Sequence, residues 1–430
     1  MSETNSFSIA IVGGGLGGLF AALCIHHHCA SSSISKPIKI DVYEQAAEYK
    51  EIGAGIAVGI SAVRLVDELG LLDDIYAIAG TRPGSNATLV YRRFDSGDEI
   101  FRMPVPKPGD MQVAACARTG LLDLFKTAVE RRGAATLHTR KACQRVEDDG
   151  EHITLSFADG TTALADLVIA CDGIHSAIRD QFVADPAVYS GQVAYRDVIP
   201  RASLGALPDN GATMWLAKHK HLLVYPISRG EEFNFVAFID QPEREARDVR
   251  ESWVTTCERA EVQAAFAEHE EGAQAILRAL SDRPAKWRIN DREPLDQWHF
   301  MGGKVMLLGD AAHAMLPHLG AGCSQSMEDG WVLGRALSDH FRGGTSSRLP
   351  TLEAVASLYQ AARLPRAQKT QTASRAVGKV YGFQAEDLVD LPFDDCCPLI
   401  AGRVREAMMS SWYGDVDVGY ENERAKRTSN

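Results

Sequence analysis

Residues 7–18 read FSIAIVGGGLGG, and this stretch decides the fold. Its first half is largely apolar and predicts a short buried strand, its glycines predict a tight turn, and residues 19–28 continue as a helix. Residues 38–44 (IKIDVYE) alternate between apolar and polar side chains and end in an acid, which predicts a second strand. A strand, a helix and a second strand in this order predict a βαβ unit.

The glycines of this stretch form the pattern GxGxxG, read at Gly13, Gly15 and Gly18. Between a strand and a helix, Gly13 permits the tight turn, Gly15 lets the backbone approach a pyrophosphate, and Gly18 lets helix and strand pack closely. Glu44 ends the second strand, where it can accept a hydrogen bond from a ribose hydroxyl. The pattern therefore predicts a dinucleotide site; the alternative is a glycine-rich turn that binds no nucleotide.

The chain has 430 residues, of which 45% are hydrophobic and 24% are charged. At about 150 residues per domain this length indicates two or three domains, with a core that needs no disulfide or structural metal. The net charge of −12 offers no basic surface for a phosphate backbone, so we expect no nucleic acid partner.

Cysteine usage and the N-terminal segment indicate the compartment. Nine cysteines occur without a CxxC pair, which suits free thiols in a reducing environment. The apolar stretch 8–25 contains five glycines and is preceded by no Lys or Arg, so we expect no signal peptide and no membrane partner. The histidines at 26–28 point about 100° apart on a helix and cannot converge, so we expect no metal site. The expected localisation is cytoplasmic.

Further along the chain the pattern predicts more strands and helices. Residues 153–164 predict a hairpin around the turn ADGT. Four strands between 186 and 290 predict an antiparallel sheet with one face available to a ligand: 192–198, 212–217, 221–226 and 233–239. Buried strands are expected at 166–171 and 304–310, helices at 119–132, 259–281, 326–341 and 352–380, and a frayed tail at 421–430.

These patterns predict an α/β protein with a Rossmann-like dinucleotide-binding domain, an antiparallel β-sheet substrate domain and C-terminal helices. The dinucleotide-binding domain spans 1–185 and resumes at 291–375, the substrate domain spans 186–290, and the C-terminal helical region and tail span 376–430. Residues near 76–105 are candidates to join the substrate sheet.

Two more segments carry chemistry. In 166–180 (DLVIACDGIHSAIRD), Asp172 follows a buried strand; the alternative is an ordinary strand-to-helix connection. In 309–329, Asp310 ends a strand, where a carboxylate can accept hydrogen bonds from ribose hydroxyls. Gly322 then opens a helix whose free N–H groups can hold a partly negative atom.

Together these stretches resemble the single-component FAD-dependent aromatic hydroxylases with the fold of p-hydroxybenzoate hydroxylase, over about residues 7–380. Within that family the sequence resembles the salicylate hydroxylases most. The stretches that carry the resemblance are GGGLGG, EIGAGI at 51–56, CART around Arg118, AYRD at 194–197, VYPI at 224–227 and GDAAHAMLPHLGAG at 309–322.

The resemblance implies a GR2-type domain with bound FAD, and NADH or NADPH as a transient co-substrate without a Rossmann domain of its own. It places Asp172 in a motif shared by FAD and nicotinamide recognition, Asp310 on the ribityl chain and Gly322 under the flavin ring. The full set of implied FAD-binding residues is Gly13, Gly15, Gly18, Glu44, Gly53, Ala54, Arg118, Asp172, Asp310 and Gly322.

Four side chains are candidates for the substrate site. His318 follows Asp310 closely and can accept a phenol proton; the alternative is a histidine that only orders its loop. His221 and Tyr225 lie on one side of a strand and line the pocket if that side faces the flavin, whereas the alternative is exposure to solvent. Arg196 can bind a carboxylate or phenolate; the alternative is a structural ion pair. In related aldehyde hydroxylases an Arg and a Tyr at positions matching Arg196 and Tyr225 bind the phenolate.

The expected activity is therefore hydroxylation of a phenolic acid through a flavin C4a-hydroperoxide, with O₂ and NAD(P)H. The favoured case is decarboxylative hydroxylation of salicylate to catechol. The alternatives are hydroxylation of another phenol, such as an orsellinic-type aldehyde or 6-hydroxynicotinate, a flavin-dependent reductase or dehydrogenase without oxygen insertion, and a flavin-binding module without turnover. The expected state is a monomer or homodimer.

Overall fold

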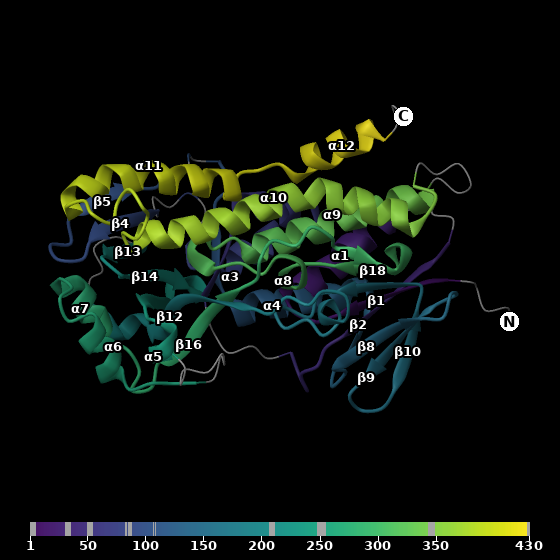
Figure 1. Ribbon diagram of the computed structural model, residues 1–430, viewed down its shortest axis with the longest axis horizontal. Coiled ribbons are helices and arrows are strands. Elements are labelled where there is room, and N and C mark those ends of the chain that lie inside the picture. Colours follow the sequence, from purple (N-terminus) through teal and green to yellow (C-terminus); the bar gives the residue numbers. More distant parts are fainter. Residues whose placement is uncertain are drawn as a thin grey trace.

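The computed structural model describes residues 6–30, 36–49, 55–81, 84, 88–105, 107, 109–205, 211–246, 255–342 and 349–427. Two large sheets lie beneath a layer of long helices that runs along one side of the molecule (Figure 1). Gly53 and Ala54, two of the residues that the resemblance assigns to FAD, lie outside the described residues.

The first sheet has six strands in the order β17-β18-β11-β1-β2-β7. Its central strands are parallel, and only the edge strand β17 runs antiparallel to its neighbour. The carboxyl ends of β1, β11 and β18 therefore meet at one edge, where doubly wound sheets bind their ligands. The strands are β1 (Phe7–Val12), β2 (Ile38–Tyr43), β7 (Thr136–His138), β11 (Leu167–Ala170), β17 (His299–Phe300) and β18 (Val305–Leu307).

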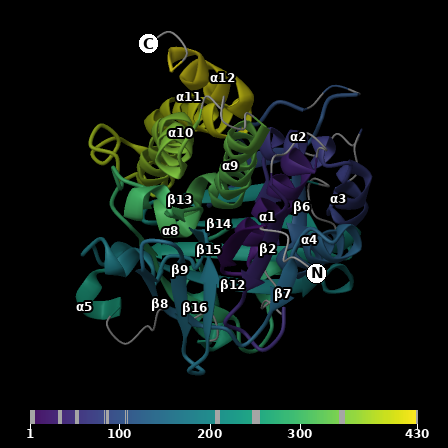
Figure 2. The ribbon, with the colours of Figure 1, turned by 90° about the vertical axis from the view of Figure 1, so that its right-hand side faces the viewer.

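Helix α1 (Leu16–Cys29) follows β1, as predicted, and packs between α4 (Arg118–Arg132) and α9 (Gly322–Arg342) (Figure 2). Its residues 18–25 are all buried, because a helix that is apolar all round belongs in a core. The expected βαβ unit is confirmed. Three shorter helices complete this region: α2 (Ile60–Glu68), α3 (Leu72–Ile78) and α8 (Asp310–His313).

Two small sheets flank the first sheet. The predicted hairpin around 158–161 is part of a three-stranded antiparallel sheet in the order β10-β9-β8. A two-stranded antiparallel pair, β3-β6, joins residues 55–58 to residues 114–117, which directly precede Arg118. The strands are β3 (Gly55–Val58), β6 (Ala114–Ala117), β8 (Cys143–Asp148), β9 (Ile153–Phe157) and β10 (Thr162–Ala165).

The second large sheet has seven strands in the order β16-β12-β15-β14-β13-β4-β5. The four strands predicted between 186 and 290 form its centre and are antiparallel to one another. The sheet is not wholly antiparallel, because β4, from the N-terminal part of the chain, pairs in parallel with β13. The strands are β4 (Leu89–Arg93), β5 (Glu99–Arg102), β12 (Val188–Pro200), β13 (Ala212–Ala217), β14 (Lys220–Ile227), β15 (Glu232–Asp240) and β16 (Ala285–Asp291).

The two faces of this sheet have different partners. One face carries Trp215, Leu222 and Phe235, among others, and packs on α6 (Arg259–Ala265) and α7 (Glu271–Arg278) as a separate apolar core. The expected single helix at 259–281 is wrong: the chain breaks between α6 and α7, where the Glu270 carboxylate caps α7 by accepting from Gly272 and Ala273 N–H. A one-turn helix, α5 (Glu243–Ala246), precedes them.

The C-terminal region forms α10 (Leu352–Tyr381), α11 (Phe393–Trp412) and α12 (Val416–Lys426). The expected frayed tail is wrong over 421–426, because these residues belong to α12. Asp415 caps that helix, and the buried Tyr420 donates its hydroxyl to Asp339 at 2.8 Å. Within the described ranges, none of the helices is long and apolar enough to cross a membrane.

Candidate functional site

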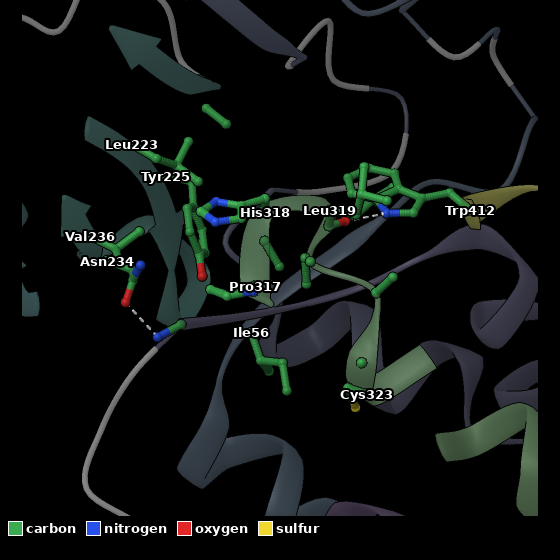
Figure 3. A pocket seen from close by; sticks show the side chains of 18 of the residues that line it. Ile56, Leu223, Tyr225, Asn234, Val236, Pro317, His318, Leu319, Cys323 and Trp412 are labelled. Carbon is green, nitrogen blue, oxygen red and sulfur yellow. Dashed lines mark hydrogen bonds between the residues drawn. The ribbon is translucent and has the colours of Figure 1, made fainter. Parts of the chain in front are cut away.

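A cavity of about 520 Å³ lies between the carboxyl edge of the six-stranded sheet and the free face of the seven-stranded sheet. One half is lined by the glycine turns that follow β1 and β18. The other half is lined by side chains of β12, β14, β15 and β16, closed by the segment 315–323 and the end of α11 (Figure 3).

The glycine turn after β1 has the geometry that a dinucleotide requires. A Cβ on Gly13 (φ +104°) would lie 2.2 Å from the Cys171 carbonyl oxygen, and one on Gly18 would lie 2.0 Å from the Gly13 carbonyl oxygen. Glycine at these positions is needed for packing within the protein. Gly15 lines the cavity instead, and a Cβ there would meet no protein atom within 4 Å. The space beside Gly15 is therefore open to a ligand.

Glu44 holds the same turn from the end of β2. Its Oε2 accepts a hydrogen bond from Gly14 N–H at 2.8 Å, and its Oε1 accepts from Ala46 N–H at 2.8 Å. Tyr49 lies beside it, and burial together with the Glu44 charge raises the pKa of that phenol. Glu44 directly follows β2, as predicted, but it does not line the cavity, and its role toward a ribose stays a prediction.

Asp172 lies beside the cavity rather than in its lining, which its neighbours Cys171 and Gly173 provide. The Asp172 Oδ2 accepts from Ile178 N–H at 3.3 Å, while burial raises the pKa of the carboxyl. Arg179, fully buried, donates to the Ala311 carbonyl at 2.9 Å. The segment predicted to carry chemistry around Asp172 therefore also fixes the loop after β18.

Asp310 begins α8 and is exposed in the cavity. The loop that presents it is anchored by Asp329, whose Oδ2 accepts from Gly309 N–H at 3.0 Å and lies 2.6 Å from His313 Nε2. Burial acts to raise the pKa of Asp329, but His313 and the buried Arg363 outweigh burial, and the pKa is lowered. Asp329 ends the 309–329 motif, but the sequence alone did not indicate that it anchors this loop.

The N-termini of two helices face this half of the cavity. Neither α1 nor α9 has an acidic residue in its first turn, and Gly15, which caps α1, makes no side-chain cap. Their free N–H groups are suited to a pyrophosphate and to an electron-rich ring edge. Gly322 begins α9, and Arg118 begins α4; both line the cavity. The open space at Gly15, the exposed Asp310 and these helix ends fit an extended FAD.

The substrate candidates come together on the free face of the seven-stranded sheet. His221, Leu223 and Tyr225 of β14 all line the cavity, as their alternation predicts, so His221 does not point to solvent. Arg196 of β12 lies on the same face, 8% exposed, with its guanidinium 4.8 Å from the centre of the Trp287 ring. Tyr225 and Arg196 both line the cavity. Burial raises the pKa of Tyr225, and the Arg196 charge partly offsets that rise.

His318 lies in the turn η5 (Pro317–Leu319) and points to the sheet (Figure 3). Its ring lies 5.4 Å from His221 and 5.0 Å from Phe238, measured between ring centres. Burial lowers the pKa of His318 to about 4, and burial together with His318 lowers that of His221. Both ring nitrogens of His318 are buried, and neither has a hydrogen-bond partner among the described residues. The edge that carries Nε2 packs against Gly378 of α10.

Sequence reasoning missed several lining residues because they come from distant elements. Asn234 of β15 accepts a hydrogen bond from Gly55 N–H at 2.6 Å and ties the sheet to β3. Tyr381 ends α10, and Met408 and Trp412 lie on α11. The alternation along β15 is a sequence signal that marks Asn234, Val236 and Phe238 as one face; no comparable pattern points to the α11 residues.

The fold and this joined cavity define a flavoprotein with the architecture of p-hydroxybenzoate hydroxylase. Comparison with known proteins agrees. A family described as the FAD binding domain matches residues 6–374. 6-Hydroxynicotinate 3-monooxygenase of Pseudomonas fluorescens is 30% identical over 380 residues, covering 86% of this chain and 91% of the relative. Salicylate hydroxylase of Pseudomonas putida is 31% identical over 394 residues, covering 87% and 86%.

A solved structure of Klebsiella pneumoniae HpxO with FAD and uric acid is similar with a TM-score of 0.76 and 25% identity, covering 96% of this chain and 99% of that one. The chain belongs to the FAD-binding-domain family, among its FAD-dependent aromatic monooxygenases. FAD is the cofactor, and NAD(P)H is the reductant typical of the family.

Proposed function

We propose that this enzyme hydroxylates a phenolic acid and that salicylate, converted to catechol with loss of CO₂, is its favoured substrate. The observation that supports this most directly is the Arg196, Tyr225 and His318 arrangement in one apolar cavity beside the flavin-binding helix ends. A single-ring anion with an adjacent hydroxyl offers a partner to each group. The nine free thiols suit the cytoplasmic location that we propose with it.

Reduced FAD, when bound, supplies together with O₂ the electrophilic oxygen, and the protein side chains prepare the ring for it. Arg196 binds the carboxylate or the phenolate, because a guanidinium matches paired oxygens. Its charge favours the phenolate form and makes the ring electron-rich. Tyr225, kept neutral by the burial that raises its pKa, donates its hydroxyl to the same oxygens.

His318 accepts the phenol proton. In the free protein the ring is neutral, since burial lowers its pKa to about 4, so an unprotonated nitrogen is ready to accept a hydrogen bond. A bound anion raises the histidine pKa again, because a nearby negative charge favours the imidazolium. Oxygen then adds at the carbon that carries the carboxylate, the bond to that carboxylate breaks, and CO₂ leaves; the second oxygen atom of O₂ leaves as water.

The test is turnover of the purified protein with NADH and air, with and without salicylate. We expect salicylate to stimulate NADH loss and catechol to form one-for-one with the NADH consumed. NADH loss that yields only H₂O₂ would leave the flavoprotein in place but remove salicylate as the hydroxylated substrate.

A second candidate substrate is 6-hydroxynicotinate. It is favoured by the 30% identity to 6-hydroxynicotinate 3-monooxygenase and is likewise an anionic ring with a hydroxyl. Arg196 would bind its carboxylate, and His318 would accept the proton of its hydroxyl, as proposed for salicylate. A higher kcat/KM for 6-hydroxynicotinate than for salicylate, with the hydroxylated product identified by chromatography, decides for it.

A further inference from the structure

The helix α11 reaches the cavity from outside the matched family region, which ends at residue 374. Its last turn brings Met408 and Trp412 into the lining. Figure 3 shows the Trp412 indole beside the turn that carries His318, on the opposite side of that turn from the sheet. The enzyme thus completes its cavity with a segment that the family match does not include.

The indole makes one directed contact with that turn. Trp412 Nε1–H donates to the Leu319 carbonyl at 2.8 Å, and Leu319 is the residue directly after His318. The next residue, Gly320, has φ +57°, so the chain reverses there and the Leu319 carbonyl is left outside the turn's own hydrogen bonds. Across the described ranges, the Trp412 N–H is the donor that satisfies this carbonyl at the end of η5.

The sequence also leaves room for the ring. A Cβ on Gly59 would lie 3.3 Å from Trp412 Cγ, and one on Gly320 would lie 3.9 Å from Trp412 Cζ2. Gly59 caps α2 and donates its N–H to Ser324 Oγ of α9 at 2.9 Å. The indole therefore packs between the two turns that lead into α2 and α9, both of which border the cavity.

The backbone around Trp412 is itself fixed. Arg366 of α10 donates to the Ser410 carbonyl and to the Ser411 carbonyl, each at 3.0 Å. The same guanidinium pairs at 2.7 Å with Glu328, whose side chain is fully buried. A buried charge that is paired in this way has one stable arrangement, so the last turn of α11 keeps its place relative to α9 and α10.

On its other side the His318 ring is pressed against α10. A Cβ on Gly378 would lie 2.4 Å from His318 Cδ2, so only glycine there admits the ring in this orientation. The ring is thus confined by Gly378, and the backbone that carries it is held by Trp412. Moving either support changes the direction in which the unpartnered nitrogens of His318 point.

We propose that Trp412 is a positioning residue, which holds the 317–320 turn so that His318 faces the substrate, and that α11 thereby sets how tightly NAD(P)H consumption is coupled to hydroxylation. This inference rests on the role of His318 in the proposed function. If His318 is misplaced, the substrate ring is poorly activated. The reduced enzyme then converts O₂ to H₂O₂ instead of hydroxylating the substrate.

The test is Trp412→Phe, which removes the indole N–H and keeps an aromatic ring. We expect the ratio of hydroxylated product to NADH consumed to fall about threefold to tenfold, the effect of one neutral hydrogen bond. The FAD dissociation constant, measured by fluorescence titration of the apoprotein, stays within about twofold, since the pyrophosphate and ribityl contacts lie elsewhere. Trp412→His restores a ring N–H and recovers part of the coupling.

The matched control is Trp331→Phe. Trp331 Nε1–H donates to Asp417 Oδ1 at 2.9 Å and so also ties the C-terminal region to α9, but Trp331 does not line the cavity. We expect this variant to lose similar thermal stability and to keep wild-type coupling. A purely structural role for Trp412 predicts the same behaviour in both variants.

The outcomes separate the two proposals. Wild-type coupling in Trp412→Phe, in a preparation where His318→Gln is uncoupled, overturns the positioning role and leaves the proposed function standing. Equal uncoupling in the Phe and His variants overturns the hydrogen bond as the cause. Failure of the wild-type enzyme to hydroxylate any phenolic acid removes the proposed function and this inference with it.

Discussion

The nucleotide half of the cavity depends mainly on glycine turns and helix ends, with Asp310 and Arg118 beside them, whereas the substrate half is built from side chains of strands and helices that are far apart in sequence. In the first half, Gly13, Gly15 and Gly18 stand within six residues and their spacing alone describes the turn. In the second, Arg196, Tyr225 and His318 come from three elements spread over more than one hundred residues. A binding site that depends on backbone geometry can be predicted from a local sequence motif. A site that depends on side chains from distant elements can be found only once the fold is known.

We expect the largest effect, loss of FAD binding, from a substitution at Gly15, where the nucleotide half of the cavity has open space. Gly15→Val places a side chain where no protein atom lies within 4 Å, so the apoprotein folds, but the branched side chain occupies the space for the pyrophosphate. We expect colourless protein with the melting temperature of the wild-type apoprotein, because bound FAD stabilises only the wild-type holoenzyme. Absorbance at the flavin maximum of the purified variant measures the result.

The paired variant Gly18→Val sharpens the comparison. Its Cβ would lie 2.0 Å from the Gly13 carbonyl oxygen, so this variant loses the fold itself rather than only FAD. Stoichiometric FAD in Gly15→Val, or a normally folded Gly18→Val, would break the distinction between a ligand-facing and a packing glycine.

The next effect concerns His318 in the substrate half. His318→Gln keeps a polar side chain of similar size but removes the proton acceptor. We expect the hydroxylation rate to fall about 10²- to 10⁴-fold, as for loss of a general base, with FAD content unchanged. Single-turnover measurement of the pre-reduced enzyme with O₂ and substrate gives the rate. A normal rate would mean that His318 only orders its turn.

The same buried histidine makes stability depend on pH. Its pKa is lowered from 6.5 to about 4 in the folded chain, so the unfolded chain binds the proton first as the pH falls. The free energy of unfolding therefore decreases from about pH 6.5 down to about pH 4, by up to about 3 kcal/mol. Denaturant unfolding of the apoprotein across this window should show a shallower decrease for His318→Gln; parallel curves would contradict the burial of a neutral ring.

The smallest effect is expected for substrate binding through Arg196. Arg196→Gln removes the positive charge on the free face of the sheet and weakens an acidic substrate by about 2 kcal/mol. Arg288→Gln, on the neighbouring strand but outside the cavity lining, is the matched control. Binding is followed by the change in flavin absorbance. An unchanged dissociation constant for the Arg196 variant would assign its guanidinium to structure alone.

Much of the fold was predictable because local patterns decided it. The strands 7–12 and 212–217 are found with the expected bounds, and the alternation along β14 correctly placed His221 and Tyr225 on the cavity side. The tail at 421–426 was mispredicted because its own composition is polar, and the buried residues that anchor α12, Val416 and Tyr420, lie just before it. The parallel pairing of β4 with β13 depends on contacts across more than one hundred residues, which no local pattern encodes.

The residues of the candidate site likewise fall into those that the sequence predicted and those that it did not. The sequence placed Gly15, Asp310, Gly322 and His318 around one ligand, and all four line the cavity. Their roles in binding and catalysis stay predictions. Trp412 could not be found from the sequence, because its contact is with a backbone carbonyl more than ninety residues away and carries no residue signature.

The most direct test of the account is turnover in ¹⁸O₂ with NADH and salicylate, followed by mass spectrometry of the catechol. The account predicts one ¹⁸O atom in each catechol molecule, because the new hydroxyl comes from O₂ at the ring carbon activated between Arg196 and His318. Catechol without ¹⁸O, or reductant consumption with no oxygenated product from any phenolic acid, would contradict oxygen transfer in this cavity.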